Sequence, residues 1–198
     1  MYPNSVKRLI DNFKCLPGIG SKTAERLAFS MLEFDKDNLT AFSNSILDIR
    51  DNIFKCRECG NISDDDICVV CSNNNRDKKI VFVVEKSKDI TLFEKLGIFN
   101  GVYHVLGGLI SPIDGVGPDE INIKELVSRI EVNQVEELIF ALKPSIEGET
   151  TMQYISKILS NKSIKISKIA TGIPMGTDME YIDSLTLELA IDERKKVN

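Results

Sequence analysis

Four of the five cysteines form two CxxC pairs that are separated by eight residues: Cys56, Cys59, Cys68 and Cys71. Each pair can bring two thiolates onto one ion, and two pairs complete the tetrahedron that zinc prefers. Gly60 follows the second cysteine, where a residue without a Cβ can take the positive φ of a tight turn. The acidic loop between the pairs is too short to build its own core, so it needs the metal to fold. Because all four ligands are thiolates, the spacing predicts structural rather than catalytic zinc.

Two other uses of paired cysteines fit the sequence less well. Disulfides suit secreted proteins, but residues Met1–Ser5 lack the basic stretch and apolar stretch that begin a signal peptide. A redox CxxC usually comes singly, between a strand and a helix. The fifth cysteine, Cys15, has no partner cysteine near it and is predicted to be a small buried apolar residue.

A second set of candidate residues is acidic. Glu85 directly follows the apolar run Ile80–Val84, and Glu147 and Glu149 follow a later apolar run, with Gly148 between them. Carboxylates at the ends of neighbouring parallel strands can converge on one lip of a sheet and bind Mg²⁺. We expect Gly148 to remove bulk and let both glutamates face one ion. The competing interpretation is that these residues are ordinary charged loop positions.

A third candidate lies in the glycine-rich turn Leu16–Gly20, which separates two stretches with helical periodicity. Gly18 and Gly20 would let backbone N–H groups approach a phosphate at a helix N-terminus, and Lys22 and Arg26 would flank that phosphate one helical turn apart. A P-loop is disfavoured because Ser21 stands between the glycine and Lys22 and because no strand precedes the turn. A turn that merely packs two helices remains open as an alternative.

The elements that position these residues show two sequence patterns, a helical pattern near the N-terminus and an alternation of strands and helices after it. Apolar residues recur at helical spacing from Val6 to Phe13, with Asn4 or Ser5 as the cap, and again from Ala24 to Met31. A third helix carries an apolar seam that could serve a core or a partner helix, and a core is favoured. The residues of this seam are Leu39, Phe42, Ile46, Ile49 and Ile53.

From Lys79 onward, strands and helices alternate. Four apolar strands are predicted near residues 80–84, 102–106, 138–142 and 164–169, with helices between them that are capped by Ser87 and Asn122. This βαβαβαβ order predicts a mainly parallel sheet, with function at the carboxyl ends of the strands. The lone histidine, His104, lies inside an apolar strand and is predicted to be a packed core residue rather than a base.

Composition places few limits on function. The chain has 198 residues, of which 42% are hydrophobic, and no apolar run approaches the ~20 residues of a membrane span. We therefore expect neither a secreted nor a membrane protein. The net charge is -5, yet the first thirty residues hold five cations against two acidic residues. An acidic protein with a basic N-terminal region is compatible with phosphate binding there.

The order of these features resembles the RecR family of bacterial recombination mediators over essentially the whole chain. LPGIGSKTAERLAF resembles that family's hairpin, VVEKSKDI and YHVLGGLISPIDGVGPDEI its first Toprim segments, KPSIEGETT its acidic motif, and IATGIPMGTDMEYID its C-terminal segment. The acidic pair is Glu-x-Glu, where catalytic Toprim enzymes typically have Asp-x-Asp, and Met175–Asp178 stands where the family more often has a second glycine.

The resemblance implies an α+β chain of several parts. These are a helical helix-hairpin-helix region at 1–54, a small four-cysteine zinc finger at 55–78, an α/β Toprim domain at 79–175, and a C-terminal segment with a helix at 176–198. It also implies a non-enzymatic role in the bacterial cytoplasm, associated with the nucleoid. A homo-oligomer, either a tetrameric ring or a dimer, would encircle gapped DNA or a junction of single and double strands without reading sequence.

The partners implied are RecO and, in some settings, RecF, with which the family loads RecA onto single strands. By position, Gly18, Gly20, Lys22 and Arg26 would contact DNA and the four cysteines would hold zinc. Glu85, Glu147 and Glu149 would serve the RecO surface or a Mg²⁺ ion. The alternative is a Mg²⁺-dependent Toprim nuclease or a related phosphoryl-transfer enzyme, with Glu85 as general acid/base and the two later glutamates as metal ligands.

Overall fold

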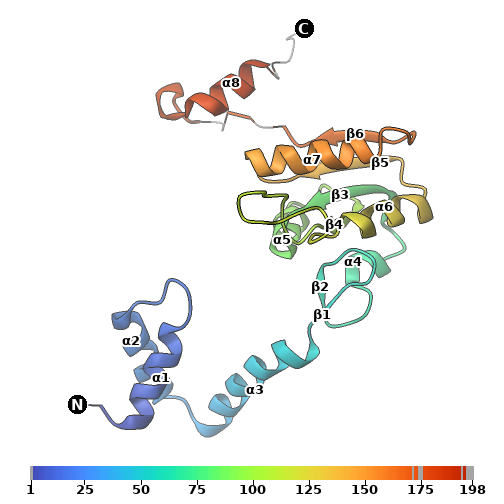
Figure 1. The fold of residues 1–198 in the computed structure, drawn as a ribbon. Coiled ribbons are helices and arrows are strands. Elements are labelled where there is room, and N and C mark those ends of the chain that lie inside the picture. The colour runs from blue at the N-terminus through green and yellow to red at the C-terminus, as the bar shows by residue number, and fades with distance from the viewer. Residues whose placement is uncertain (1, 171, 174–175, 193, 195–198) are drawn as a thin grey trace. The chain divides into compact units, whose positions relative to one another are not determined.

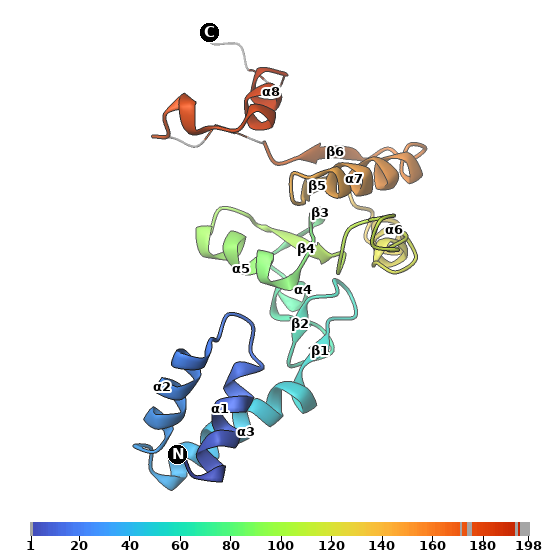
Figure 2. The same cartoon turned by 60° about the vertical axis from the view of Figure 1, so that its left-hand side comes forward.

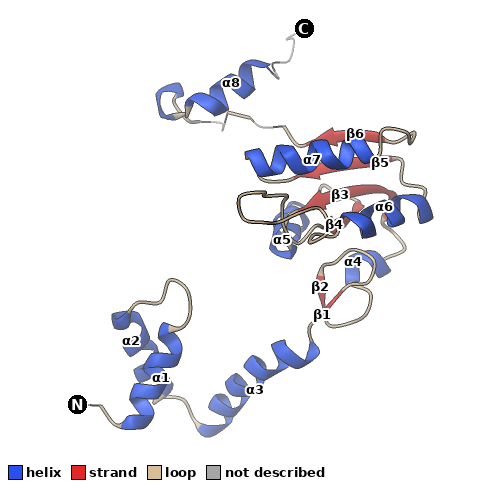
Figure 3. Cartoon of the chain, viewed as in Figure 1, coloured by secondary structure: helices blue, strands red, loops and turns tan. Residues whose placement is uncertain are grey.

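The computed structural model describes residues 2–170, 172–173, 176–192 and 194. The chain divides into two compact units, residues 1–53 and residues 54–198, and each is described by itself. Figure 1 follows the chain from one end to the other, and Figure 3 separates its helices from its strands. Of the C-terminal segment compared above, residues 171, 174 and 175 lie outside the described residues.

The first unit contains three helices: α1 (Asn4–Lys14), α2 (Ser21–Met31) and α3 (Lys36–Asn52). A small core joins α1 to α2, in which Ile10, Ala24 and Ala28 are buried. The small alanines let the two helices approach closely, so the glycine-rich turn between them is held at one end of a packed pair. The expected cap at Asn4 or Ser5 is wrong, because α1 begins at Asn4 with Pro3 at the N-cap and without a side-chain capping bond.

Two further expectations for this unit are wrong. Cys15 is exposed rather than buried, since it caps the C-terminus of α1, where its Sγ contacts the Asp11 carbonyl at 3.4 Å. Helix α3, whose N-cap Asp35 accepts from the Asn38 N–H at 2.7 Å, buries none of its residues. The apolar seam predicted to enter a core is thus exposed, with Ile46 at 56% and Ile49 at 68%.

The second unit begins with the finger, which consists of β1 (Phe54–Lys55), β2 (Ile62–Ser63) and the short helix α4 (Val69–Ser72). Strands β1 and β2 pair antiparallel. The four cysteines belong to the same buried cluster as the strands of the sheet that follows. The finger and the sheet therefore share one core.

The sheet contains β3 (Asp77–Val84), β4 (Gly101–Val105), β5 (Glu137–Ala141) and β6 (Lys165–Lys168), in the order β4-β3-β5-β6. All neighbouring strands are parallel, as the alternating sequence predicted. The connecting helices are α5 (Ser87–Leu96), α6 (Ile123–Val132) and α7 (Ile146–Ile158). Figure 2 shows α5 on the side of the sheet opposite α6 and α7, which is the arrangement that right-handed crossovers require for this strand order.

Of the two predicted caps in this half, the position of Asn122 is confirmed and that of Ser87 is wrong. Lys86 is the N-cap of α5, and its backbone N–H donates to the Asp89 carboxylate at 2.9 Å. Ser87 instead accepts from the Ile62 N–H at 3.2 Å. Asn122 does occupy the N-cap position of α6, but its side chain donates to the Val105 carbonyl at 2.8 Å. After the sheet come a short 3₁₀ turn, Met179–Tyr181, and α8 (Ser184–Asp192).

Candidate functional site

The four cysteines form a compact, buried thiol cluster. Their sulfur atoms all lie within 4.8 Å of one another, and none of the four residues is more than 2% exposed. The sulfurs of Cys59 and Cys68 lie 3.5 Å apart, far beyond a disulfide bond, and all four cysteines are free thiols. This arrangement fits a tetrahedral thiolate zinc site. The metal-ligand prediction for these residues therefore agrees with the geometry.

The local backbone explains how the first CxxC pair is shaped. The Gly60 N–H donates to the Cys56 carbonyl at 2.8 Å, and Gly60 takes φ +72° as predicted. The Cys68 N–H points at the Cys56 sulfur, 3.3 Å away, and helps to orient that sulfur. Zinc binds the thiolate form of cysteine, so zinc binding displaces the protons of these buried thiols, and zinc affinity should fall as the pH falls.

Arg129, on α6, ties the cluster to the sheet domain. It is only 6% exposed, and its guanidinium donates to the Tyr103 carbonyl and to the Cys71 sulfur, the latter at 3.4 Å. A zinc ion with four thiolates carries net negative charge, so a buried guanidinium both offsets that charge and orients a ligand. Sequence reasoning missed Arg129, because a cation on an amphipathic helix resembles any solvated position. A buried site with four thiolates needs a nearby cation, but the sequence does not indicate which of the 25 lysines and arginines supplies it.

Backbone contacts join the finger to the edge strand β4. The Val105 N–H donates to the Cys59 carbonyl at 2.7 Å. His104 is 1% exposed, which confirms the prediction of a packed core residue, and burial lowers its pKa to about 4. Its Nε2 lies 2.8 Å from the Asn122 carbonyl, so the neutral ring donates there. The finger is thus attached to β4 and to the start of α6, and the zinc site stabilises that edge of the sheet.

The glycine-rich turn has the conformation that a phosphate contact needs. Gly18 takes φ +80°, and Gly20 is the N-cap of α2 with an extended backbone. Lys22 and Arg26 are both exposed on α2, one turn apart. Among the described residues, neither forms an ion pair. The turn therefore presents a helix N-terminus and two available cations on one surface of the first unit.

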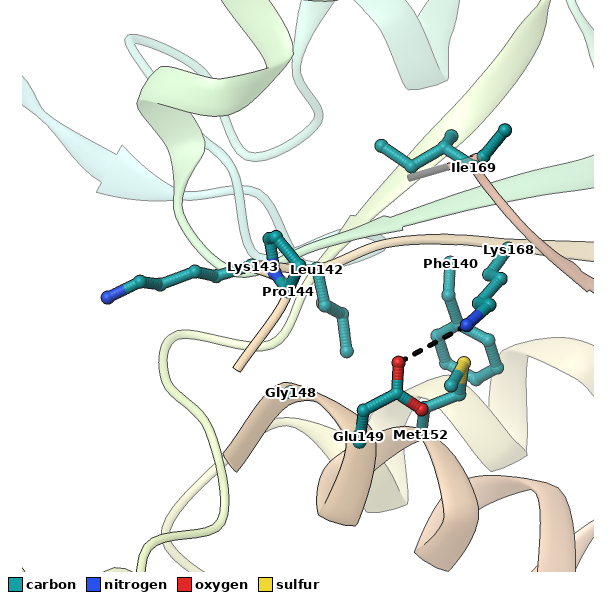
Figure 4. Close-up of a pocket in the computed structure, with 10 residues that line it drawn as sticks. Phe140, Leu142, Lys143, Pro144, Gly148, Glu149, Met152, Lys168 and Ile169 are labelled. Carbon is teal, nitrogen blue, oxygen red and sulfur yellow. Dashed lines mark hydrogen bonds and ion pairs between the residues drawn. The ribbon is translucent and has the colours of Figure 1, made fainter. Parts of the chain in front are cut away.

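The acidic residues do not form the metal site that the sequence suggested. Glu85 pairs with Lys86 at 2.9 Å, and Glu149 pairs with Lys168 at 3.4 Å, as Figure 4 shows for the latter. Across the part of the chain that the structure describes, the cysteines are the one group of three or more potential ligands that lies close together. The expected convergence of three carboxylates is therefore wrong.

The reason is that Glu147 and Glu149 lie in the first turn of α7 rather than in a loop. Residues two apart on a helix point about 200° apart around its axis, so the two glutamates diverge. Glu149 lines a small cavity with Lys143 and Lys168 at the carboxyl ends of β5 and β6 (Figure 4). Hydrogen bonds from its own backbone N–H and from Ser145, the N-cap residue, lower the pKa of Glu147, so this side chain is ionised.

Gly148 has a role other than the predicted one. A Cβ at this position would lie 2.0 Å from the Lys143 carbonyl oxygen, which is backbone and cannot swing away. The absence of a side chain lets α7 begin directly against the end of β5, with the Gly148 N–H donating to the Ser145 hydroxyl at 3.2 Å. Gly148 therefore sets the position of the acidic turn.

We expect Gly148→Ala to destabilise the protein by about 1–3 kcal/mol, because the first turn of α7 must move away from the Lys143 carbonyl. Urea unfolding of the full chain measures this loss. Gly172→Ala is the matched control, since a Cβ at Gly172 meets nothing within 4 Å and its φ is not positive. Equal stability of the two variants would contradict the steric role assigned to Gly148.

Among the described residues, no helix is both long enough and apolar enough to span a bilayer. A helical hairpin with a glycine-rich turn, a buried four-cysteine finger and a parallel α/β domain follow one another along the chain, and this combination is typical of nucleic-acid-binding proteins.

Comparison with known proteins gives the family. Residues 6–50 match the RecR helix-hairpin-helix, residues 53–73 the four-cysteine zinc finger domain of RecR, residues 79–170 the Toprim domain, and residues 172–195 the RecR C-terminal region. The chain is 45% identical over 194 residues to "Recombination protein RecR" of Lactobacillus johnsonii, covering 98% of each chain. The chain belongs to the RecR family, as the resemblance implied. Membership of that family indicates a role in DNA recombination and repair.

Proposed function

We propose that this chain is a non-enzymatic recombination mediator that binds DNA through its helix-hairpin-helix and acts as a ring-like clamp. The observation that carries the proposal is the surface at the start of α2, where the N-cap Gly20 lies beside the exposed cations Lys22 and Arg26. Backbone N–H groups and two cations suit a phosphate and read no base edge. Binding is therefore independent of sequence and sensitive to salt.

Oligomerisation strengthens such a clamp. Few phosphate contacts per subunit become many when several subunits surround one DNA. The exposed apolar seam of α3 supports a homo-oligomer, a tetrameric ring or a dimer, because an apolar stripe of this size gains stability when another surface covers it. The four-part division predicted from the sequence, with the hairpin, finger, Toprim domain and C-terminal segment in that order, is the plan we propose for each subunit.

The Toprim acids serve a partner rather than a reaction. We assign Glu85, Glu147 and Glu149 to a surface for RecO, with RecF taking part in some settings, so that RecA is loaded onto gapped DNA. Acidic side chains attract a basic partner and keep DNA on the basic region of the first unit. The ion pairs of Glu85 and Glu149 with lysines favour this role over a Mg²⁺ site. The protein would work in the bacterial cytoplasm, with the nucleoid.

Replacing both Lys22 and Arg26 with Ala is expected to weaken binding to gapped duplex and to lower the slope of log K against log salt by about 2 for each subunit that contacts the DNA. A native gel with end-labelled gapped duplex and Mg²⁺, run at several salt concentrations, measures both effects. The matched control is the Lys95→Ala, Lys157→Ala double variant, which removes two exposed Toprim cations and the same charge.

With the wild-type protein, the labelled DNA should be retarded in the gel and should remain full length. An unchanged salt slope in the Lys22 and Arg26 variant would reject the hairpin as the DNA site. Shortened DNA that disappears with Glu147→Gln would reject the mediator and establish a Toprim nuclease.

A further inference from the structure

Three buried side-chain atoms in the described part of the chain have no hydrogen-bond partner, and all three belong to residues at or beside the finger. They are Glu58 Oε2, His104 Nδ1 and Arg129 Nε. Buried polar atoms are almost always paired, because an unpaired one has lost its bonds to water without replacement. Unpaired atoms gathered at one place therefore indicate a site that another group completes.

Glu58 and His104 line the same small cavity, which lies between the finger and the start of α6 and is here called the knuckle cavity. Its volume is about 170 Å³, and Glu125, in the first turn of α6, brings a second carboxylate to its lining. The Nε2 of His104 donates to the Asn122 carbonyl at 2.8 Å, so the unpaired Nδ1 is an acceptor. The knuckle cavity thus gathers acceptors from the finger, from β4 and from α6. The acids proposed to serve RecO do not line it.

The charge around the knuckle cavity favours a cation. Cys56 also lines it, and a zinc ion held by four thiolates leaves net negative charge beside the two carboxylates. Of the two cations in the lining, Arg57 pairs with Asp66 at 3.2 Å and its side chain is 75% exposed. The other, Lys55, is exposed on β1. These surface cations offset the negative field at the buried acceptors only in part.

The acceptors suit a forked donor rather than a metal ion. Within the described ranges, the four cysteines are the one set of three or more potential ligand atoms that lies close together, so Glu58, His104 and Glu125 do not converge on one ion. A guanidinium carries five N–H donors in a rigid plane and can bridge acceptors that lie farther apart. Its bonds to a carboxylate are assisted by charge, and are therefore stronger than those of a neutral donor such as water.

We propose that the knuckle cavity binds a guanidinium group, which donates to Glu58 Oε2 and to His104 Nδ1. Glu125 adds a second negative charge from α6. The chemistry is that of an arginine, either as a side chain of another polypeptide or as the free amino acid. Free arginine also carries a carboxylate, which the two carboxylates of the cavity repel, so we expect arginine within a polypeptide to bind more tightly. The inference does not depend on DNA binding by the hairpin.

His104 is the single histidine of the chain, so its ring nitrogens can be followed by NMR without overlap from another histidine. The full-length, zinc-loaded protein is titrated with N-acetyl-arginine amide. The Nδ1 resonance should shift in a saturable way, with a dissociation constant of about 1 mM, and Glu58→Gln should weaken binding at least about tenfold. The matched control is Asp64→Asn, which removes an exposed acid from the same finger and should leave the affinity unchanged. Free L-arginine should bind more weakly than the capped amide, and the reverse order would assign the site to the free amino acid.

Zinc content is measured for each variant, because Glu58 lies between two zinc ligands. If Glu58→Gln loses zinc, Glu125→Gln on α6 takes its place, with an expected loss of about threefold. An Nδ1 resonance that does not move with capped arginine up to about 50 mM would overturn the site and leave water as the occupant. An equal shift with methylammonium would also overturn it, because that shift would report charge rather than the planar fork. Binding seen only in Lys55→Ala would show that the chain's own lysine fills the cavity, which likewise rejects the proposal.

Discussion

Cys59→Ser is expected to abolish stoichiometric zinc binding and to unfold the finger. Structural zinc in small cysteine sites contributes about 10–16 kcal/mol of apparent binding energy, and here that energy is folding energy. The effect should extend beyond the finger, because the Cys59 carbonyl accepts from the Val105 N–H and the cysteines share the core of the sheet. Zinc content per chain and thermal unfolding of the same preparations measure the two losses.

Cys15→Ser provides the matched control for that experiment. Cys15 is exposed at the end of α1 and takes no part in the cluster, so its replacement should leave zinc content and the unfolding temperature unchanged. Chelation of zinc from the wild-type chain should reproduce the effect of Cys59→Ser. Full zinc content in Cys59→Ser would show that the four-thiolate site is wrong.

Local pattern predicted much of this molecule. The spacing of the cysteines located the metal ligands, because CxxC geometry is a property of four consecutive residues. The β-branched run at Ile80–Val84 identified β3, and the alternation that follows it predicted a parallel sheet whose neighbours are now seen. Where a feature depends on a few adjacent residues, the sequence was sufficient.

Features that depend on distant residues were missed or misread. Arg129 meets Cys71 across 58 positions, and no local pattern relates them. The Glu-x-Glu motif predicts two carboxylates that face one ion, yet Ser145 caps a helix that starts one residue later and turns the two carboxylates apart. The seam of α3 shows a related limit, since periodicity reveals an apolar stripe but not what covers it.

Arg129→Met should lower the free energy of unfolding by about 3 kcal/mol, because it removes two buried hydrogen bonds from a charged donor, each worth about 1.5–3 kcal/mol. Methionine fills much of the same volume, so loss of charge rather than loss of packing dominates. Without the guanidinium, the thiolate charge of the zinc site is less well compensated. We therefore also expect zinc affinity to fall about 10–100-fold, as measured by competition with a chromogenic chelator.

Lys124→Met separates this effect from a general change of charge on α6. Lys124 lies on the same helix, and its side chain is 77% exposed in an ion pair with Asp119, so its replacement should alter stability and zinc affinity little. Arg129→Lys keeps the charge but cannot reach both the Cys71 sulfur and the Tyr103 carbonyl as a planar fork does. Partial recovery of zinc affinity with lysine would assign the remaining loss to geometry. Wild-type zinc affinity in Arg129→Met would show that the guanidinium serves packing alone and that the zinc site is independent of α6.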